Sequence, residues 1–343
     1  MTLAPTETDS GTIQPETNLS GAGTDQGASQ SQNALEVAFS IIASCAFVFN
    51  LAFCVVLLKK RAMLKKPHNS LLFNLALTDL LTGAFLILTP GYVSDKPLFP
   101  IADGFGGQLF CALLGNRYLL FLVAKESVFL VTCLAMERWY CVMRPMEYKK
   151  HFGRKRLLIY IVVSWIASCA LQSHKFLEQK LSGNKCVPVD VPYGREGAQA
   201  FISVKSVSTF VIPCFVTWLT FAHIKFRAPV YLNDKSSQSE RRERQQKLVL
   251  HMCALTAFVV TLCWLPAQLS YTLTPFGITS VSSPFHKAFN VVSLVNSCIN
   301  PFIYWYYHRE FREEFIRLFC FCKLAKKVII VKQQEVSLSN SKS

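Results

Sequence analysis

Seven long apolar runs constrain this chain more than any other feature of its sequence. They cover about residues 35–58, 69–93, 110–141, 157–177, 199–225, 248–273 and 285–307. A helix rises ~1.5 Å per residue, so each run is long enough to cross ~30 Å of hydrocarbon. Because 51% of the 343 residues are hydrophobic, we predict an all-α membrane protein, a seven-transmembrane helix bundle.

The lysines and arginines are distributed in a way that orients this bundle. Residues 1–58 contain neither, and basic clusters follow the first, third and fifth runs, at 59–66, 144–156 and 241–247. Lys and Arg remain on the cytoplasmic side, which predicts an extracellular amino terminus and a cytoplasmic carboxyl terminus in the plasma membrane. This pattern accounts for the net charge of +15 without any binding of nucleic acid.

The two ends of the chain are predicted to lie outside the bundle, which occupies residues 35–308. Residues 1–34 are rich in Thr, Ser, Gly and Gln, which favours a disordered extracellular tail with a glycosylation site at Asn18. Residues 309–322 alternate apolar and charged residues at helical spacing, which indicates an amphipathic eighth helix on the inner membrane face. Palmitoylation of Cys320 and Cys322 would add an anchor, and residues 323–343 are predicted to be a disordered cytoplasmic tail.

Five polar residues fall near the middle of apolar runs: Asn50, Asp79, Ser127, Asn296 and Asn300. Carboxylates are rare inside membranes and usually mark function. Two accounts of Asp79 remain open. Asparagines could hydrogen-bond it and hold helices together, or oxygen ligands around this one carboxylate could bind a small hard cation.

Prolines predict that several of the helices bend. Pro213, Pro266 and Pro301 lie inside the fifth, sixth and seventh runs, and Pro90 is expected to kink the outer end of the second. Bent helices around a buried polar cluster favour a bundle that rearranges over a rigid pore.

Charged residues also occur inside two of the runs. Lys125 and Glu126 lie in the third run, Arg117 nearer its outer end, and Lys205 at similar depth in the fifth. Adjacent helical residues point in different directions, so Lys125 and Glu126 need different partners. Either the cations face a cavity and bind an anionic ligand group, or Glu126 or another carboxylate neutralises them.

Several short motifs follow one another on successive runs. They are Asn50; Asn74-Leu75-Ala76-Leu77-Thr78-Asp79-Leu80-Leu81; Glu137-Arg138-Trp139 with Pro145; Trp165; Pro213; Cys263-Trp264-Leu265-Pro266; and Asn300-Pro301-Phe302-Ile303-Tyr304. In this order they resemble the rhodopsin-like family of G-protein-coupled receptors, over about residues 35–322. By itself, the Glu137-Arg138 pair could be a solvated helix end, whereas its place after the third span favours a cytoplasmic switch.

The resemblance implies a receptor rather than an enzyme, which binds an extracellular ligand and activates a heterotrimeric G protein. Arg138 would be held by Glu137 at rest and released on activation, with Met146 and Tyr304 in the same switch. Trp264 would form the floor of the ligand pocket, with Gln268, Tyr271 and Asn290 as polar pocket residues. The resemblance also implies a Cys111–Cys186 disulfide and an allosteric sodium ion at Asp79, Ser127, Asn296 and Asn300, without any other cofactor. Arrestin and receptor kinases would act at the tail serines, Ser337, Ser339, Ser341 and Ser343.

The sequence departs from the family pattern mainly around the switch. Glu137 replaces the usual Asp and Trp139 the usual Tyr, Phe221 stands where a Tyr would receive Arg138, and Gln246 stands where an acidic residue opens the sixth helix. We therefore expect a weaker resting lock and raised basal signalling. The spacing from Cys111 to Arg138 is also two residues longer than usual.

The ligand class follows mainly by elimination. An amine receptor of this family would have an Asp where the two possible alignments give Leu120 or Tyr118, and an opsin would have a Lys in place of Leu294. A peptide ligand is therefore favoured, and a small anionic or lipid ligand held by Lys205, Arg117 or Lys125 is the alternative. A transporter or channel would need a continuous polar path, whereas these polar residues cluster. The seven histidines show no spacing typical of a metal or catalytic site.

Overall fold

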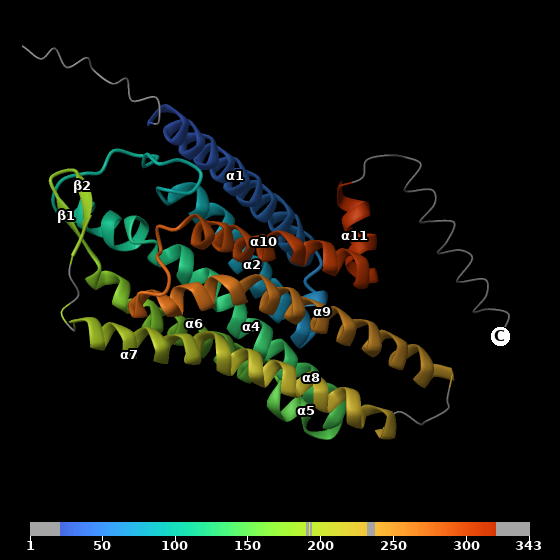
Figure 1. Ribbon diagram of the computed structural model, residues 1–343. Helices are drawn as coiled ribbons and strands as arrows, with labels where there is room; N and C mark the ends of the chain where they lie inside the picture. The colour runs from blue at the N-terminus through green and yellow to red at the C-terminus, as the bar shows by residue number, and fades with distance from the viewer. Residues whose placement is uncertain (1–20, 190–191, 193, 232–236, 320–343) are drawn as a thin grey trace, which may run out of the picture.

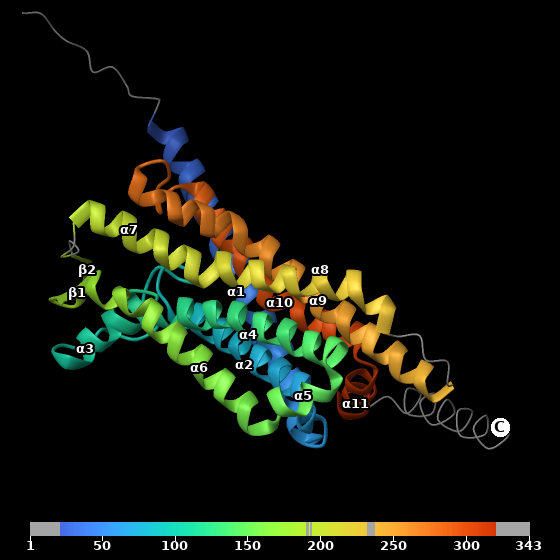
Figure 2. The same ribbon diagram turned by 90° about the horizontal axis from the view of Figure 1, so that it is seen from below.

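The computed structural model describes residues 21–189, 192, 194–231 and 237–319, in which long helices run lengthwise beside one another (Figures 1 and 2). The long helices are α1 (Gly21–Lys59), α2 (Pro67–Leu88), α4 (Tyr118–Met143), α6 (Arg154–Gln172), α8 (Ile212–Tyr231), α9 (Ser237–Leu273) and α10 (Pro284–Tyr307). Lipid offers no partner to backbone polar groups, so an apolar chain satisfies them within its own helices.

Six helical stretches of the described chain are long and apolar enough to cross a membrane. They are Gln32–Lys59, Pro67–Leu88, Phe105–Met143, Arg154–Leu177, Gly194–Arg227 and Arg244–Phe276, and they coincide with the first six predicted runs. The seventh run corresponds to α10, whose 24 residues would extend ~36 Å. Asn290, Asn296 and Asn300 interrupt its apolar sequence, and it is not among these six stretches. It packs against α1, α2 and α9 and completes the bundle.

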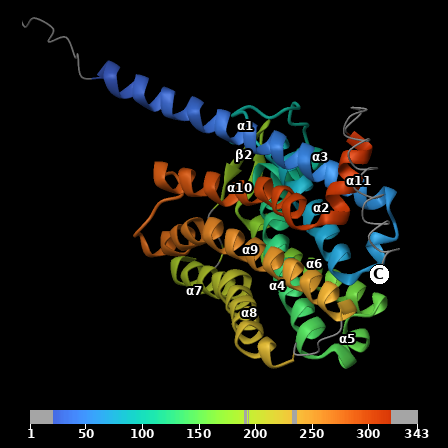
Figure 3. The same cartoon turned by 90° about the vertical axis from the view of Figure 1, so that its right-hand side faces the viewer.

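Helix α4 lies at the centre of the bundle, where it contacts α2, α6, α8 and α9 (Figure 3). Within its apolar span 67% of the residues are buried, against 33% for the span that contains α6. Leu120, Leu130 and Leu134 are fully enclosed on α4, whereas Val162 and Ile166 of α6 are exposed. Polar and charged groups on α4 can therefore reach most of the other helices.

A short hairpin and a disulfide organise the end of the bundle at which α4 begins. Strands β1 (Gln179–Ser182) and β2 (Lys185–Pro188) pair antiparallel, with Leu181 opposite Cys186. Cys186 forms a disulfide with Cys111, 75 residues earlier, which is the pair that the resemblance implies. Gly115 lies against this bond, because a Cβ at that position would be 2.9 Å from the Cys186 Sγ.

The third run is not one continuous helix, contrary to the sequence prediction. It consists of α3 (Phe105–Phe110), a π-helical turn (Cys111–Gly115) and α4. Between the last two, Arg117 has a φ of 62° and is the one non-glycine residue with positive φ in the described chain. A π turn contains more residues per turn than an α-helix. The turn and the left-handed residue together accommodate the two extra residues between Cys111 and Arg138.

Three predicted boundaries also change. α1 begins at Gly21, so residues 21–34 of the predicted tail are helical. The helix can continue through them because no proline interrupts positions 16–66 and because adding residues to an existing helix costs little free energy. α2 ends at Leu88 with Thr89 extended, so Pro90 ends the helix instead of kinking it, because a residue before proline avoids the helical conformation. In the fifth run, α7 (Gly194–Ser206) leads into a second π turn (Val207–Val211), and Pro213 lies in the first turn of α8.

Helix α11 (Arg309–Phe319) follows α10 and lies at the opposite end of the bundle from β1 and β2 (Figure 1). His308 joins the two helices: its Nδ1 accepts a hydrogen bond from the Phe311 N–H at 3.3 Å, and its Nε2 is 3.0 Å from the Asn69 Oδ1. The predicted modification sites Asn18, Cys320 and Cys322, and the tail serines, lie outside the described residues.

Candidate functional site

A cavity of about 50 Å³ lies among α4, α6, α7, α9 and α10, in the half of the bundle that is closer to the Cys111–Cys186 disulfide. Its lining residues are Phe121, Lys125, Gln172, Lys175, Lys205, Trp264, Ala267, Gln268, Tyr271, His286 and Asn290. Six of the seven predicted ligand-binding residues are among them: Lys125, Lys205, Trp264, Gln268, Tyr271 and Asn290. The structure thus brings together side chains that lie up to 165 positions apart in the sequence, from Lys125 to Asn290.

Arg117 is the predicted ligand-binding residue that does not line this cavity. Its left-handed backbone lies before the first turn of α4, and its guanidinium carbon lies 5.4 Å from the centre of the Tyr92 ring. Gln172, Lys175 and His286 line the cavity and were not predicted. Lys175 lies beyond the clean apolar core of the fourth run, where nothing in the local pattern shows that the chain turns back over the pocket.

The electrostatic character of the cavity is positive. Three lysines line it, and none of its lining residues is acidic. Lys175 forms an ion pair with Glu178, with 2.6 Å between Nζ and Oε2. The Lys205 Nζ is 3.0 Å from the His174 Nε2 and 5.1 Å from the centre of the Tyr271 ring.

Lys125 and Glu126 point to different sides of α4. The Lys125 ammonium donates a hydrogen bond to the Gln268 Oε1 and lies 4.3 Å from the centre of the Trp264 ring. The Glu126 carboxylate accepts hydrogen bonds from the hydroxyls of Ser164 (2.6 Å) and Ser168 (2.7 Å) on α6. Glu126 therefore does not neutralise Lys125, and the alternative that assigned it this role is wrong.

Deeper in the bundle, the side chains of Asn50, Asp79, Ser127, Asn296 and Asn300 are all buried. Asn300 donates a hydrogen bond to one Asp79 oxygen at 2.8 Å, and the Ser127 hydroxyl donates to the Ala124 carbonyl. Four side-chain oxygens, on Asn50, Asp79, Asn296 and Asn300, are buried without a hydrogen-bond donor among the described residues. A buried acceptor without a donor costs ~1–3 kcal/mol. Carboxylate and amide oxygens are ligands that hard cations prefer, so this set fits a small cation.

The Glu137–Arg138 pair lies near the C-terminal end of α4, and both side chains are buried. The Arg138 Nε lies 2.5 Å from one Glu137 oxygen, and its Nη2 pairs with the other. The hydroxyl of Tyr148, on α5 (Pro145–His151), donates a hydrogen bond to the same carboxylate. Burial, followed by the nearby Glu137 charge, raises the pKa of the Tyr148 hydroxyl, which keeps it protonated as a donor.

The comparisons with known proteins agree with this arrangement. Residues 49–304 match the family described as 7 transmembrane receptor (rhodopsin family), which is most of the chain. The chain belongs to this family. It is therefore a membrane receptor and not an enzyme.

The receptor is similar to several curated proteins at low identity. It is 23% identical to galanin receptor 2a of Danio rerio, over 86% of this chain and 80% of that protein. It is 25% identical to neuropeptide receptor 22 of Caenorhabditis elegans, over 81% of this chain and 67% of the relative. It is also 25% identical to the type-2 angiotensin II receptor of Ovis aries, over 84% of this chain and 80% of the relative.

The remaining switch residues of the receptor lie in different environments. Met146 is 94% exposed on α5, whereas Tyr304 is fully buried against the Phe53 ring, at 4.9 Å between centroids. The Trp139 Nε1 donates a hydrogen bond to the His223 Nδ1 at 3.0 Å, a link between α4 and α8 that was not predicted. A motif on one helix cannot show which residue of a neighbouring helix it will face.

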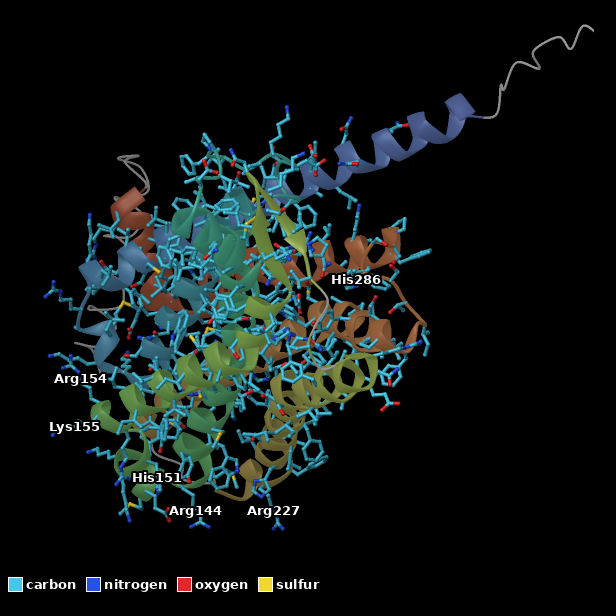
Figure 4. All side chains as sticks on the ribbon, turned by 90° about the vertical axis from the view of Figure 1, so that its left-hand side faces the viewer. Arg144, His151, Arg154, Lys155, Arg227 and His286 are labelled. Atoms are coloured by element: carbon cyan, nitrogen blue, oxygen red, sulfur yellow. A yellow bond between two sulfur atoms is a disulfide. The ribbon has the colours of Figure 1, made fainter. Side chains whose placement is uncertain are left out.

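Basic side chains project around the inner end of the receptor. Arg144, His151, Arg154, Lys155 and Arg227 extend outward from the periphery of the bundle in Figure 4. These residues follow the third run or end the fifth, as predicted for segments that remain on the cytoplasmic side.

Proposed function

We propose that this receptor binds an extracellular peptide and activates a heterotrimeric G protein across the plasma membrane. The observation that carries the proposal is that α4 joins the lysine-lined cavity at one end to the buried Glu137–Arg138 pair at the other. One relative is named a neuropeptide receptor, and two others are named for galanin and angiotensin II. A ligand that shifts α4 relative to its neighbours would change the environment of Arg138.

In this proposal the amino terminus is extracellular and carries the glycosylation site at Asn18. α10 is the seventh span, and α11 lies on the inner membrane face, where Cys320 and Cys322 would be palmitoylated. Two contacts support this position of α11: Lys60 pairs with Glu314, and the Lys66 Nζ lies 2.9 Å from a Glu310 oxygen. Phosphorylation of the tail serines by receptor kinases would recruit arrestin.

The cavity is too small for a whole peptide, so only one group of the ligand would enter it. Its three lysines favour an anionic group, such as the carboxylate of a peptide. Lys205, which has His174 and Tyr271 as neighbours, would be its anchor. A small carboxylic acid or lipid acid remains the second candidate, because it offers the same charged group.

The cluster around Asp79 is proposed as the site of an allosteric sodium ion. Asp79 would supply the charged ligand, and Ser127, Asn296 and Asn300 would supply neutral oxygens. A cation there would favour the resting state, in which these helices surround the cluster closely.

The proposal is tested by screening a peptide library against a panel of G-protein activation sensors in cells that express the receptor. Lys205→Ala is then compared with Lys287→Ala, which removes an exposed lysine at the outer end of α10, outside the cavity lining. We expect Lys205→Ala to lower the potency of the identified ligand at least about tenfold, since a charged hydrogen bond contributes ~1.5–3 kcal/mol. Unchanged potency in Lys205→Ala would refute the anchor, and a silent sensor panel would refute the proposed signalling function.

A further inference from the structure

Lys125 is a buried cation that has no role of its own in the proposed function, where Lys205 is the anchor of the ligand. Its side chain is 5% exposed and faces the cavity. Of its three N–H bonds, one is used by the Gln268 Oε1. Its other neighbours include the faces of two aromatic rings, Trp264 at 4.3 Å and Phe210 at 5.8 Å from Nζ to the ring centre.

The side chains that contact the Lys125 ammonium, Gln268, Trp264 and Phe210, carry no charge. Aromatic faces attract a cation more weakly than a carboxylate does, and an isolated buried ammonium is strongly disfavoured relative to water. The adjacent Glu126 points to the other side of α4, where serines of α6 donate to both of its oxygens, and it forms no ion pair with Lys125 within the described chain. The ammonium therefore has donor capacity that an anion entering the cavity would use.

The two buried lysines lie at different depths. Lys205 contacts Tyr271, whereas Lys125 contacts Gln268 and Trp264, which lie three and seven residues deeper along α9. Three to seven helical residues correspond to ~5–10 Å. An anionic group held at Lys205 could thus remain near the mouth of the cavity, whereas contact with Lys125 requires a compact group that reaches the floor.

Contact with Lys125 would have consequences beyond binding. Trp264 lies two residues before Pro266, which interrupts the hydrogen bonds of α9. Gln268 accepts from Lys125 and donates to the Ser206 hydroxyl at 2.9 Å, which connects α4, α9 and α7. Movement of the ammonium away from Trp264 and Gln268 would loosen both contacts beside the proline.

We propose that Lys125 is a second anion-binding residue at the floor of the cavity, and that the ligand is a carboxylate whose compact anionic group displaces Lys125 from Trp264 and Gln268. This deepens the proposed function and rests on it for the signalling consequence. A free carboxylate at a peptide end and a lipid acid share the required chemistry, whereas an amide does not. Lys125 is the residue that distinguishes acid from amide.

The first test uses binding alone, with acetate as the probe. Thermal unfolding of the purified full-length receptor is measured in sodium acetate and in sodium gluconate at equal ionic strength. Gluconate is the control carboxylate, because its hydroxyl groups would lose their water beside the Trp264 and Phe210 rings. Acetamide added to the gluconate buffer is the neutral control. We expect acetate to raise the unfolding temperature of the wild type by about 2 °C or more. We expect a smaller rise in Lys125→Met, in which Lys205 remains to bind acetate, a normal rise in Lys287→Met, and no effect of acetamide.

The second test uses signalling, with peptides prepared as free acids and as amides, and octanoate with octanamide as the lipid arm. Within the pair that activates the receptor, we expect the acid to be at least tenfold more potent than the amide. Lys125→Met should reduce that ratio at least tenfold, and Lys125→Arg should restore it. The arm that responds identifies the source of the carboxylate.

The two tests separate failure of this inference from failure of the proposed function. An acetate shift that is absent from the wild type, or that is undiminished in Lys125→Met, overturns the role of Lys125 whatever the sensors report. Equal potency of acids and amides overturns it as well. An acetate shift that depends on Lys125, together with silent sensors, leaves the anion site established and refutes the signalling function. Lys125→Met removes a buried charge and keeps a similar volume, so the variant is expected to fold.

Discussion

The hydrogen bond from Tyr148 to Glu137 predicts a measurable increase in basal signalling when it is removed. Tyr148→Phe deletes one hydroxyl and leaves the Glu137–Arg138 pair with one partner fewer. Sequence alignment indicated a weak lock, because Gln246 and Phe221 cannot restrain or receive Arg138. In the structure Gln246 is exposed and Phe221 is buried, and the third-helix carboxylate is held from α5 instead.

The expected magnitude follows from the charge of the acceptor. A hydrogen bond to a charged group contributes ~1.5–3 kcal/mol, which corresponds to a ~10- to 150-fold change in a two-state equilibrium. If about 1% of receptors are active at rest, loss of a bond made only in the resting state raises that fraction to ~9–60%. Wild-type basal signalling should already exceed that of mock-transfected cells, as the weak lock predicts.

The assay is ligand-independent activation of a G-protein sensor, normalised to receptor at the cell surface. Tyr140→Phe is the matched control, because the Tyr140 ring stacks on His151 at 4.7 Å and its hydroxyl bonds to none of the described residues. We expect a rise in Tyr148→Phe and none in Tyr140→Phe. Equal basal signalling in Tyr148→Phe and wild type, or an equal rise in both variants, would show that the bond does not restrain the switch.

Three further predictions concern stability. Sodium should stabilise the wild type against thermal unfolding relative to choline, by ~1.4 kcal/mol at ten times its dissociation constant, and a shift that survives in Asp79→Asn would refute the cation site. Gly83→Ala should cost ~1–3 kcal/mol and lower the unfolding temperature, because its Cβ would lie 2.7 Å from a backbone oxygen of α1; Gly106→Ala, with its nearest atom at 3.6 Å, should have little effect. Burial lowers the pKa of His308, so the folded protein favours the neutral imidazole. The stabilisation that neutral His308 gives to the docking of α11 is present above the unfolded pKa of ~6.5, and it is lost as pH falls through the folded pKa. Amide hydrogen exchange of α11, corrected for intrinsic rates, should therefore increase between pH 7.5 and 5.5 in the wild type, and increase less in His308→Gln.

The sequence alone determined the membrane-spanning character of the chain. Runs of apolar residues and the positions of lysine and arginine act locally, since each segment partitions between water and lipid largely by its own composition. This is why the first six predicted runs coincide with helices of sufficient length. The order of motifs indicated the family for the same reason, because each motif is read within one span.

Local pattern failed where backbone geometry depends on neighbouring segments. The break at Arg117 and the π turn before it depend on the hairpin and on the disulfide. The disulfide joins residues 75 positions apart. The early start of α1 and the end of α2 at Leu88 are boundary effects, for which composition changes too gradually to mark one residue.

Only the tertiary structure decided which charged and polar groups meet. The sequence placed Lys125 and Glu126 side by side and left open whether they neutralise each other; rotation about α4 directs one to Trp264 and the other to two serines of α6. Tyr148 reaches Glu137 because α5 folds back under α4. Such partners are set by helix rotation and packing, in which every neighbour contributes a little, so a single segment does not encode them.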